Sequence, residues 1–291
     1  MGKKYKSIKH RIISYTMHFT KLCIGCLFIV PTLIGCDDKF EYDKFSPLED
    51  YSNFITTPEE DSLFNVAISA CYTSSNYGKT VGVFGGSVSC FSESNIAKGL
   101  WKKFLNMKIK TYGKPGHGFS YTQGSIQNQV NEAHKHDIYI LWASTNDLQF
   151  NHPIGNATDY SVYDNFDKQK RETQCGGINY CIRTLREKNP ECTIYLFTSL
   201  KFFSAYGYGY IRKIESNESN ISHTLYDYIE GQIACAQSHN IQYLNQWEIQ
   251  DGQITPSNYS KYYKEDGFHL TSYGYFNIGI HQLLFLAQAN K

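Results

Sequence analysis

Short apolar runs alternate with amphipathic stretches along most of this 291-residue chain. Five runs are rich in β-branched and aromatic residues, the composition of buried strands. They lie at 80–84, 107–112, 137–144, 192–198 and 241–244. Between them, apolar residues recur at the spacing of helix faces. The alternation has no internal repeat and predicts one α/β domain, a three-layer α/β/α sandwich with a five-stranded, mainly parallel sheet.

The first helix of this domain has a clear beginning. Thr57 is a good N-cap, Pro58 suits the first helical position, and Glu60 completes a capping box. The polar residues before it lack the apolar spacing of a helix or strand. We therefore expect a tether over 36–56 and the folded domain over 57–291.

Loops after the strands point to a binding edge. Parallel sheets bind ligands at the carboxyl ends of their strands, and polar or glycine-rich loops follow the first four runs. Two loops, 148–171 and 200–222, are long for a compact domain, which is unusual unless they have a function. They are rich in Tyr, Phe, Asn and Ser, so we expect them to form a substrate-binding rim.

Ser87 follows the first strand on a tight turn. Gly85 and Gly86 end the apolar run, and a helical pattern begins after Ser92. A strand, a glycine turn carrying a serine and then a helix is one way in which α/β folds expose a nucleophile. Taken alone, the same turn occurs in many α/β proteins, so the rest of the chain has to support this interpretation.

The C-terminal region contains Asp266-Gly267-Phe268-His269. A carboxylate three residues before a histidine can hydrogen-bond one nitrogen of its ring. The other nitrogen is then free to take the hydroxyl proton of a serine. Taken alone, His269 is as well explained as a cap for the following helix.

Together, four short blocks resemble the SGNH (GDSL-like) hydrolase family over about residues 79–290. Gly85-Gly86-Ser87 corresponds to the nucleophile block of that family and Asp266-x-x-His269 to its Asp-x-x-His block. Gly116 stands at the glycine block, and 144–147 (Ser-Thr-Asn-Asp) matches the asparagine block. Each block is short, and their order and spacing around the strands make the resemblance specific.

The resemblance implies an α/β/α hydrolase without a metal or organic cofactor. Ser87 would be the nucleophile, His269 the general base and Asp266 the residue that orients it. The backbone N–H groups of Ser87 and Gly116 and the side-chain amide of Asn146 would form an oxyanion hole. Such neutral donors stabilise the negative oxygen of a tetrahedral intermediate. Asn146 could also be a turn-forming residue.

Two residues depart from the family pattern. The aspartate that usually precedes the nucleophile is Gly86 in this chain. The glycine that usually opens the asparagine block is Ser144. Neither position supplies a triad or oxyanion group in the family scheme, so activity is compatible with both changes.

The N-terminus has the layout of an export signal. A basic segment precedes an apolar stretch that is interrupted by Pro31 and is too short for a good membrane-spanning helix. Residues 33–36, Leu-Ile-Gly-Cys, resemble a bacterial lipobox. We expect a lipoprotein signal peptide over 1–35, lipidation of Cys36 and an exported protein anchored in a membrane by its lipid alone, periplasmic or on the cell surface. A plain signal peptide is the alternative.

The charge balance and the cysteine spacing argue against a nucleic-acid-binding protein and a zinc-binding protein. Residues 1–35 carry six basic and no acidic side chains, and the remainder has 22 basic and 27 acidic residues, a net charge of −5. This balance argues against nucleic acid as a partner. The cysteines beyond residue 36 match no zinc-ligand spacing, so no metal site is expected.

The sequence thus predicts a serine esterase that removes an O-acyl group through a Ser87 acyl-enzyme. The substrate would be a small-molecule or polysaccharide ester, with a carbohydrate O-acetyl group favoured because the long loops suit sugar faces and hydroxyls. Two alternatives stay open at this point. One is a lipase or lysophospholipase, and the other is an inactive glycan-binding protein with the same fold.

Overall fold

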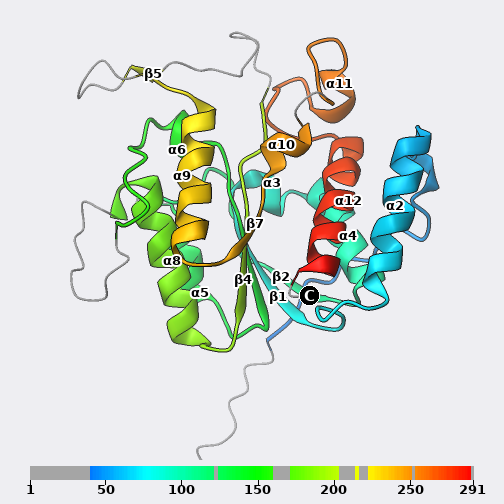
Figure 1. Cartoon of the computed structure of the whole chain (residues 1–291), viewed down its shortest axis with the longest axis horizontal. Coiled ribbons are helices and arrows are strands. Elements are labelled where there is room, and N and C mark those ends of the chain that lie inside the picture. Colours follow the sequence, from blue (N-terminus) through cyan, green and yellow to red (C-terminus); the bar gives the residue numbers. More distant parts are fainter. Residues whose placement is uncertain are drawn as a thin grey trace, which may run out of the picture. The chain divides into compact units, whose positions relative to one another are not determined.

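Five parallel strands form the centre of the domain in a computed structural model of the chain (Figure 1). The structure describes residues 40–120, 124–159, 171–202, 214–215, 222–250 and 253–289. The strand order is β2-β1-β3-β4-β7, and every neighbouring pair runs parallel. The strands are β1 (Thr80–Gly85), β2 (Lys108–Thr111), β3 (Ile138–Trp142), β4 (Thr193–Phe197) and β7 (Gln242–Leu244). The predicted α/β fold is confirmed.

Helices cover both faces of the sheet and give three layers (Figure 1). α4 and α12 cover one face, with α2 packed against α12, and α5, α8 and α9 cover the other. The long helices are α2 (Pro58–Cys71), α4 (Asn95–Phe104), α5 (Ile126–Glu132), α8 (Gln174–Lys188), α9 (Leu225–Ser238) and α12 (Ser272–Gln288). Shorter elements are η2 (Ser52–Phe54), α3 (Ser87–Cys90), η3 (Ser92–Ser94), α6 (Asn146–Gln149), β5 (Ile214–Glu215), β6 (Ser222–His223), α10 (Gln246–Gln250) and α11 (Tyr259–Tyr262).

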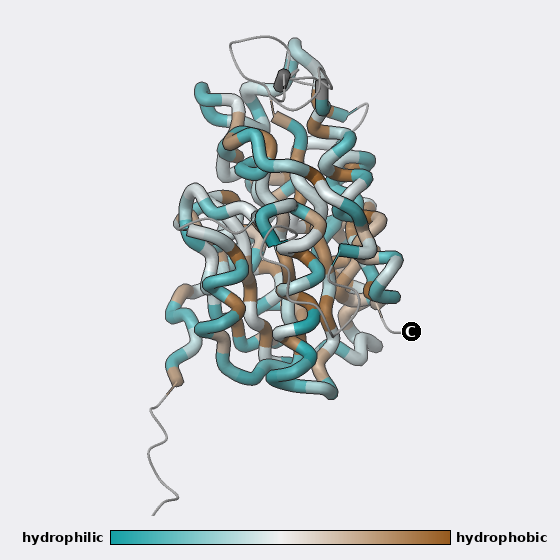
Figure 2. The backbone as a smooth tube through the Cα atoms, turned by 90° about the vertical axis from the view of Figure 1, so that its left-hand side faces the viewer, coloured by the Kyte–Doolittle hydropathy of each residue, from teal (hydrophilic) through white to brown (hydrophobic). Residues whose placement is uncertain are grey.

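The three central strands, β1, β3 and β4, are apolar on both sides because each side of the sheet packs against helices. Along β3, Ile138 and Ile140 belong to the hydrophobic cluster under α4 and α12, whereas Tyr139 and Leu141 belong to the cluster under α5 and α8. This alternation follows from the two-residue period of a strand. Figure 2 shows hydrophobic segments in the interior and hydrophilic ones mostly at the loops and outer helices.

The predicted start of α2 is confirmed in detail. The side chain of Thr57 accepts a hydrogen bond from the backbone N–H of Glu60, and the Glu60 carboxylate accepts one from the Thr57 N–H. Pro58 occupies the first turn, where no backbone donor is needed. One other boundary differs from prediction: α4 begins at Asn95, after a 3₁₀ turn, rather than directly after Ser92.

The expected tether and domain boundary need correction. The compact unit that contains the sheet begins at Tyr42 rather than at residue 57. Tyr51, placed in the tether by its polar neighbours, is 2% exposed, and its ring stacks on that of Phe276 with centroids 6.0 Å apart. The second half of the expected tether is therefore part of the core.

The same segment covers the edge of the sheet. The backbone N–H of Asp43 donates to the carbonyl of Ile109 in β2 at 2.8 Å. The Asp43 carboxylate accepts a hydrogen bond from the Thr111 N–H at 2.8 Å. A free strand edge invites pairing with other chains, so these contacts protect β2.

Candidate active site

Ser87 lies where β1 ends and α3 begins. Gly86 is the residue before α3, with an extended backbone that turns the chain out of the sheet. The hydroxyl of Ser89 donates to the carbonyl of Gly86 at 2.8 Å, and the Phe91 N–H donates to the carbonyl of Ser87 at 3.0 Å. The buried ammonium of Lys98 donates to the Ser89 carbonyl at 3.1 Å. These bonds fix the turn that presents Ser87.

The side chain of His269 contacts that of Ser87, although the two residues are far apart in the sequence. Its Nε2 lies 2.9 Å from the Oγ of Ser87, and its Nδ1 lies 2.7 Å from the Oδ2 of Asp266. The ring of Phe91 packs on the imidazole with centroids 4.7 Å apart. The structure thus brings together the three side chains that the sequence assigned to a triad, in the order serine, histidine, carboxylate.

A short turn sets the position of Asp266. Its Oδ1 accepts hydrogen bonds from the backbone N–H groups of Phe268 and His269 at 2.8 and 2.9 Å. Gly267 has a φ of 71°, which a residue with a side chain rarely adopts. Partial burial raises the pKa of Asp266, but the hydrogen bonds from His269 and Phe268 outweigh it, so the pKa lies below its usual value. The carboxylate is therefore ionised at neutral pH.

A cavity of about 280 Å³ opens beside Ser87. Gly116 and Asn146 line it together with His269. The loop after β2 carries Gly116, and α6 begins at Asn146, just beyond the end of β3. The residues predicted to form an oxyanion hole therefore meet at the carboxyl edge of the sheet, as the parallel topology requires.

The side-chain amide of Asn146 is held by one bond. Its Nδ2 donates to the backbone carbonyl of His117 at 2.9 Å. An amide nitrogen carries two hydrogens, so the second remains available for a ligand in the cavity. The backbone carbonyl is an acceptor only, which fixes the orientation of the Asn146 amide.

Aromatic side chains border the cavity. Phe91, Phe150 and Phe268 line it, and Phe150 is 57% exposed. The ring of Phe268 stacks on Phe202 with centroids 4.9 Å apart. Flat apolar faces beside hydrogen-bonding groups suit ligands that carry both kinds of surface.

Gln129 joins two parts of the site and was not predicted. It is fully buried, accepts a hydrogen bond from the Gly85 N–H at 3.0 Å and donates to the Gly85 carbonyl at 2.9 Å. It also donates to Nδ1 of His117 at 3.1 Å. A signal existed in the sequence, because Gln129 lies between Ile126 and Val130 on the apolar face of its helix.

Asp147 holds the neighbouring loop in the same way. Its buried carboxylate accepts hydrogen bonds from the N–H groups of Phe119 and Ser120 at 2.8 and 2.9 Å. The Nδ1 of His152 lies 3.3 Å from its Oδ1. The sequence placed Asp147 in the asparagine block without assigning it a role.

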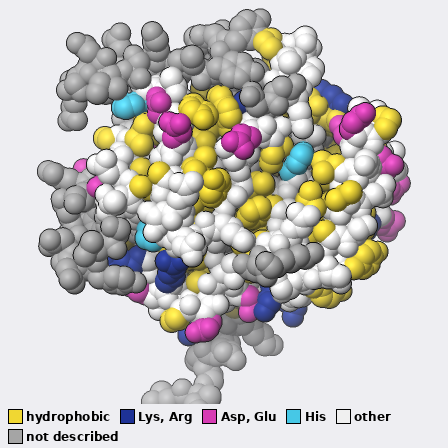
Figure 3. All heavy atoms as spheres, in the orientation of Figure 1, with side chains coloured by type: hydrophobic (Ala, Val, Ile, Leu, Met, Phe, Trp, Pro, Cys, Tyr) yellow, Lys and Arg dark blue, Asp and Glu magenta, His cyan; other side chains and the backbone are white. Residues whose placement is uncertain are grey.

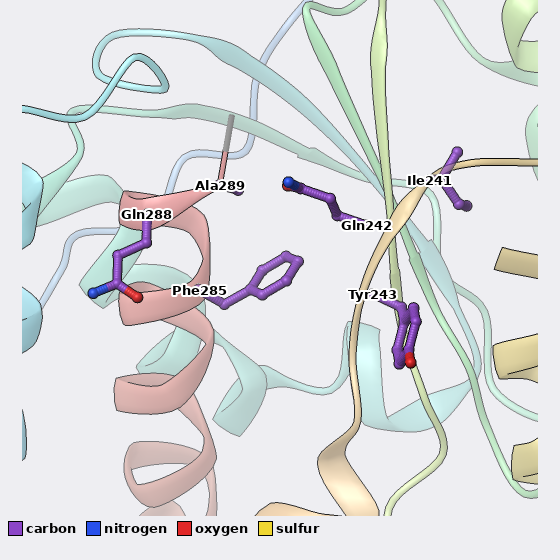
Figure 4. Close-up of a pocket in the computed structure, with 6 residues that line it drawn as sticks. All are labelled: Ile241, Gln242, Tyr243, Phe285, Gln288 and Ala289. Atoms are coloured by element: carbon purple, nitrogen blue, oxygen red, sulfur yellow. The ribbon is translucent and has the colours of Figure 1, made fainter. Parts of the chain in front are cut away.

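A second cavity lacks the triad residue types that line the one beside Ser87. This cavity of about 450 Å³ lies between β7 and the end of α12 (Figure 4), where the ring of Phe285 reaches toward the strand and Gln288 points away from it. It contains no serine, histidine or carboxylate. Within the described ranges there is no group of three or more His, Cys, Asp or Glu side chains that could hold a metal ion.

On the face in Figure 3, Lys and Arg side chains outside the grey regions are scattered rather than gathered into a basic patch. Absence of a nucleic-acid partner stays a prediction. None of the helices described by the structure is long and apolar enough to cross a membrane.

Some predictions fall outside the described residues. The signal peptide over 1–35 and the lipidated Cys36 lie there entirely. The predicted rim loops lie there in part, at 160–170, 203–213 and 216–221.

Comparisons with known proteins agree with this fold. No protein-family model and no curated protein matches the sequence. Among solved structures, a protein from Lactobacillus plantarum is 15% identical with a TM-score of 0.55, and the match covers 71% of this chain and 96% of that one. A possible lipase from Chitinophaga pinensis is 17% identical with a TM-score of 0.50, covering 71% and 97% of the two chains. A third structure, also 17% identical, has a TM-score of 0.58 and covers 74% and 99%.

At these identities the matches establish the fold. Each neighbour is covered almost completely, so the likeness extends over its whole domain. The predicted α/β/α sandwich with a five-stranded parallel sheet is confirmed.

Proposed function

We propose that this chain is a serine esterase of the SGNH type that removes O-acyl groups through an acyl-enzyme on Ser87. The observation that supports this most strongly is the chain of contacts from Ser87 through His269 to Asp266 beside a cavity lined by Gly116 and Asn146. Each group has the chemistry that acyl transfer needs.

The reaction follows from this arrangement. Ser87 Oγ attacks the ester carbonyl while Nε2 of His269 takes its proton, and Asp266 stabilises the resulting imidazolium. The negative oxygen of the tetrahedral intermediate receives hydrogen bonds from the Asn146 amide and the backbone N–H groups of Ser87 and Gly116. His269 then protonates the leaving alcohol, and a water molecule, activated by the same ring, hydrolyses the acyl-enzyme.

The cavity favours a short acyl group. Pockets for drug-sized ligands span about 300–1,000 Å³, and this one is about 280 Å³. The exposed ring of Phe150 and the polar Thr145 and Gln149 at the same cavity suit the faces and hydroxyl groups of a sugar. We therefore propose a carbohydrate O-acetyl ester as the substrate, in preference to a long-chain lipid.

Acetate release from a panel of acetylated polysaccharides tests this proposal. We expect wild-type protein to release acetate and Ser87→Ala to release none. A strong preference for long-chain over acetyl p-nitrophenyl esters would favour a lipase. If the protein binds a polysaccharide, releases no acetate and is not covalently labelled at Ser87, an inactive glycan-binding protein would be favoured.

We further propose that the protein is exported and anchored by a lipid on Cys36. The lipobox-like residues 33–36 at the end of an apolar segment support this proposal. Incorporation of labelled fatty acid in a bacterial host that is lost in Cys36→Ala would agree with it. Equal incorporation in both forms would contradict it.

A further inference from the structure

The two residues that depart from the SGNH pattern lie against each other. A Cβ atom added to Gly86 would be 2.8 Å from Cβ of Ser144 and 2.8 Å from Nδ2 of Asn146. It would also be 3.0 Å from the backbone oxygen of His117. Non-bonded carbon atoms prefer separations of about 3.5–4.0 Å. Only glycine therefore fits at position 86 while Ser144 and Asn146 keep their places.

Ser144 does more than fill space. Its hydroxyl donates to the backbone oxygen of His117 at 2.9 Å, the same atom that accepts from Nδ2 of Asn146 at 2.9 Å. The backbone N–H of Asn146 lies 3.3 Å from the Ser144 hydroxyl oxygen, which accepts from it. A carbonyl oxygen has two lone pairs, so these two donors saturate it. Ser144 and Asn146 are 6% and 7% exposed, so water has little access to replace either bond.

This arrangement fixes the candidate oxyanion amide. With one N–H of Asn146 held by His117, the amide plane cannot rotate without breaking that bond. The Ser144 hydroxyl holds the same carbonyl from a second direction and also bonds the backbone of Asn146. The second N–H of the amide therefore has a set direction before a substrate arrives, which is the preorganisation that electrostatic catalysis requires.

We propose that Ser144 is a positioning residue for the Asn146 amide and that Gly86 is its steric counterpart. At this contact Ser144 of the asparagine block supplies a side chain, and Gly86, before the nucleophile, has none. The family pattern has the reverse, with a side chain before the nucleophile and a glycine opening the asparagine block. The two departures are thus coupled, because each accommodates the other. This inference rests on the function proposed above, because it assigns Asn146 to the oxyanion hole.

Four variants test the coupling: Gly86→Ala, Ser144→Gly, Gly86→Ala/Ser144→Gly and Gly86→Ala/Ser144→Ala. Gly86→Ala should lower kcat for p-nitrophenyl acetate by about 10²-fold with a smaller effect on KM, as expected for loss of one oxyanion donor. Ser144→Gly should cost about tenfold through the lost hydrogen bonds. The Gly86→Ala/Ser144→Gly double variant should recover at least about tenfold over Gly86→Ala, because the contact with Cβ of Ser144 is gone and the new Cβ can shift away from Asn146 and His117.

The Ser144→Ala double variant is the matched control. It removes the hydroxyl but keeps the Cβ that lies 2.8 Å from the added atom, so it should not recover. Equal kcat in wild type and Gly86→Ala would overturn the inference. Strictly multiplicative losses in the Gly86→Ala/Ser144→Gly variant would overturn it as well.

A separate readout distinguishes this inference from the proposed function. If wild-type protein neither hydrolyses esters nor reacts with a fluorophosphonate probe at Ser87, the proposed function fails and so does the role of Ser144 in it. The steric coupling is then read from thermal unfolding, where Gly86→Ala should lower the midpoint and added Ser144→Gly should restore part of it. If wild type is labelled and all variants react at its rate, only the positioning role is wrong.

Discussion

Nε2 of His269 lies 2.9 Å from Oγ of Ser87, although the two residues are 182 positions apart in the chain. Ser87 lies at the end of the first strand, and His269 lies in the turn before the last helix. Because β1 lies inside the sheet and α12 packs on its face, neither partner can move far without disturbing the core. The contact is thus a consequence of the fold rather than of local sequence.

Asp266→Asn tests the orientation of the imidazole. The amide would present N–H₂ to Nδ1 and favour the tautomer with a proton on Nε2, which cannot accept the proton of Ser87. The Asp266 side chain is 45% exposed, so we expect a kcat loss of about 10²–10³-fold, less than for a fully buried triad carboxylate. The neighbouring, exposed Glu265→Gln should change kcat by less than about twofold. Equal effects of the two variants would contradict the assignment.

Stability should fall as the pH drops from about 6.5 to about 4. Burial lowers the pKa of His136 to about 4 and that of His281 to about 4. The unfolded chain binds these protons first, so the stability that the neutral rings contribute is present above pH 6.5 and is lost below it. Thermal unfolding midpoints measured across this range should show the decline.

His281→Leu should flatten this decline. Nε2 of His281 is buried with no hydrogen-bond partner among the described residues, and Glu59, Glu60 and Lys261 line the same cavity of about 370 Å³. Removing an unpaired buried polar atom should also raise the midpoint at pH 7. An unchanged slope in this variant would show that His281 is not among the groups that titrate.

Tyr51 tests whether residues before α2 belong to the core. Its ring is 2% exposed and its hydroxyl is buried without a hydrogen-bond partner among the described residues. Tyr51→Ala should lower the free energy of unfolding by about 3–5 kcal/mol, as for other buried aromatic residues. Tyr51→Phe keeps the ring and should be neutral or slightly stabilising. Chemical denaturation measures both, and a small effect of Tyr51→Ala would mean that this segment is a loose tether.

Gln129→Leu should disturb the turn before Ser87. Leucine leaves the backbone N–H of Gly85 unpaired in the interior, at a cost of about 1–3 kcal/mol. It also removes one of two hydrogen bonds to the Gly85 carbonyl, which still accepts from the Lys114 N–H at 3.1 Å. We expect a lower unfolding midpoint and a kcat reduced by about tenfold. Asn128→Ala, on the same helix, is the control and should leave kcat unchanged. Wild-type kcat in Gln129→Leu would show that the Gly85 contact does not affect the nucleophile.

The sequence predicts those parts of this molecule that depend on local pattern. Buried strands appear as continuous apolar runs, the α2 cap as a capping box, and Ser87 as a serine on a glycine turn. Because strands and helices alternate along the chain, the sheet is parallel and the carboxyl ends of its strands lie at one edge. Ser87, Asn146 and His269 come near one another at this edge.

Contacts between distant residues were not predictable in the same way. Tyr51 lies in a polar stretch without periodicity, and only packing against α12 shows that it belongs to the core. Gln129 is a polar residue on a helix face, and its bonds to Gly85 and His117 depend on how the helix docks. The match between Gly86 and Ser144 likewise requires distances across two loops.

The rate at which a fluorophosphonate probe labels Ser87 tests the central claim most directly. Wild-type protein and the exposed-site control Ser92→Ala should be labelled at equal rates, with the probe on the peptide that contains Ser87. Ser87→Ala should not react, and His269→Ala should react at least about 10²-fold more slowly, because the hydroxyl loses its base. Labelling that persists in Ser87→Ala, or that is unaffected in His269→Ala, would contradict the account.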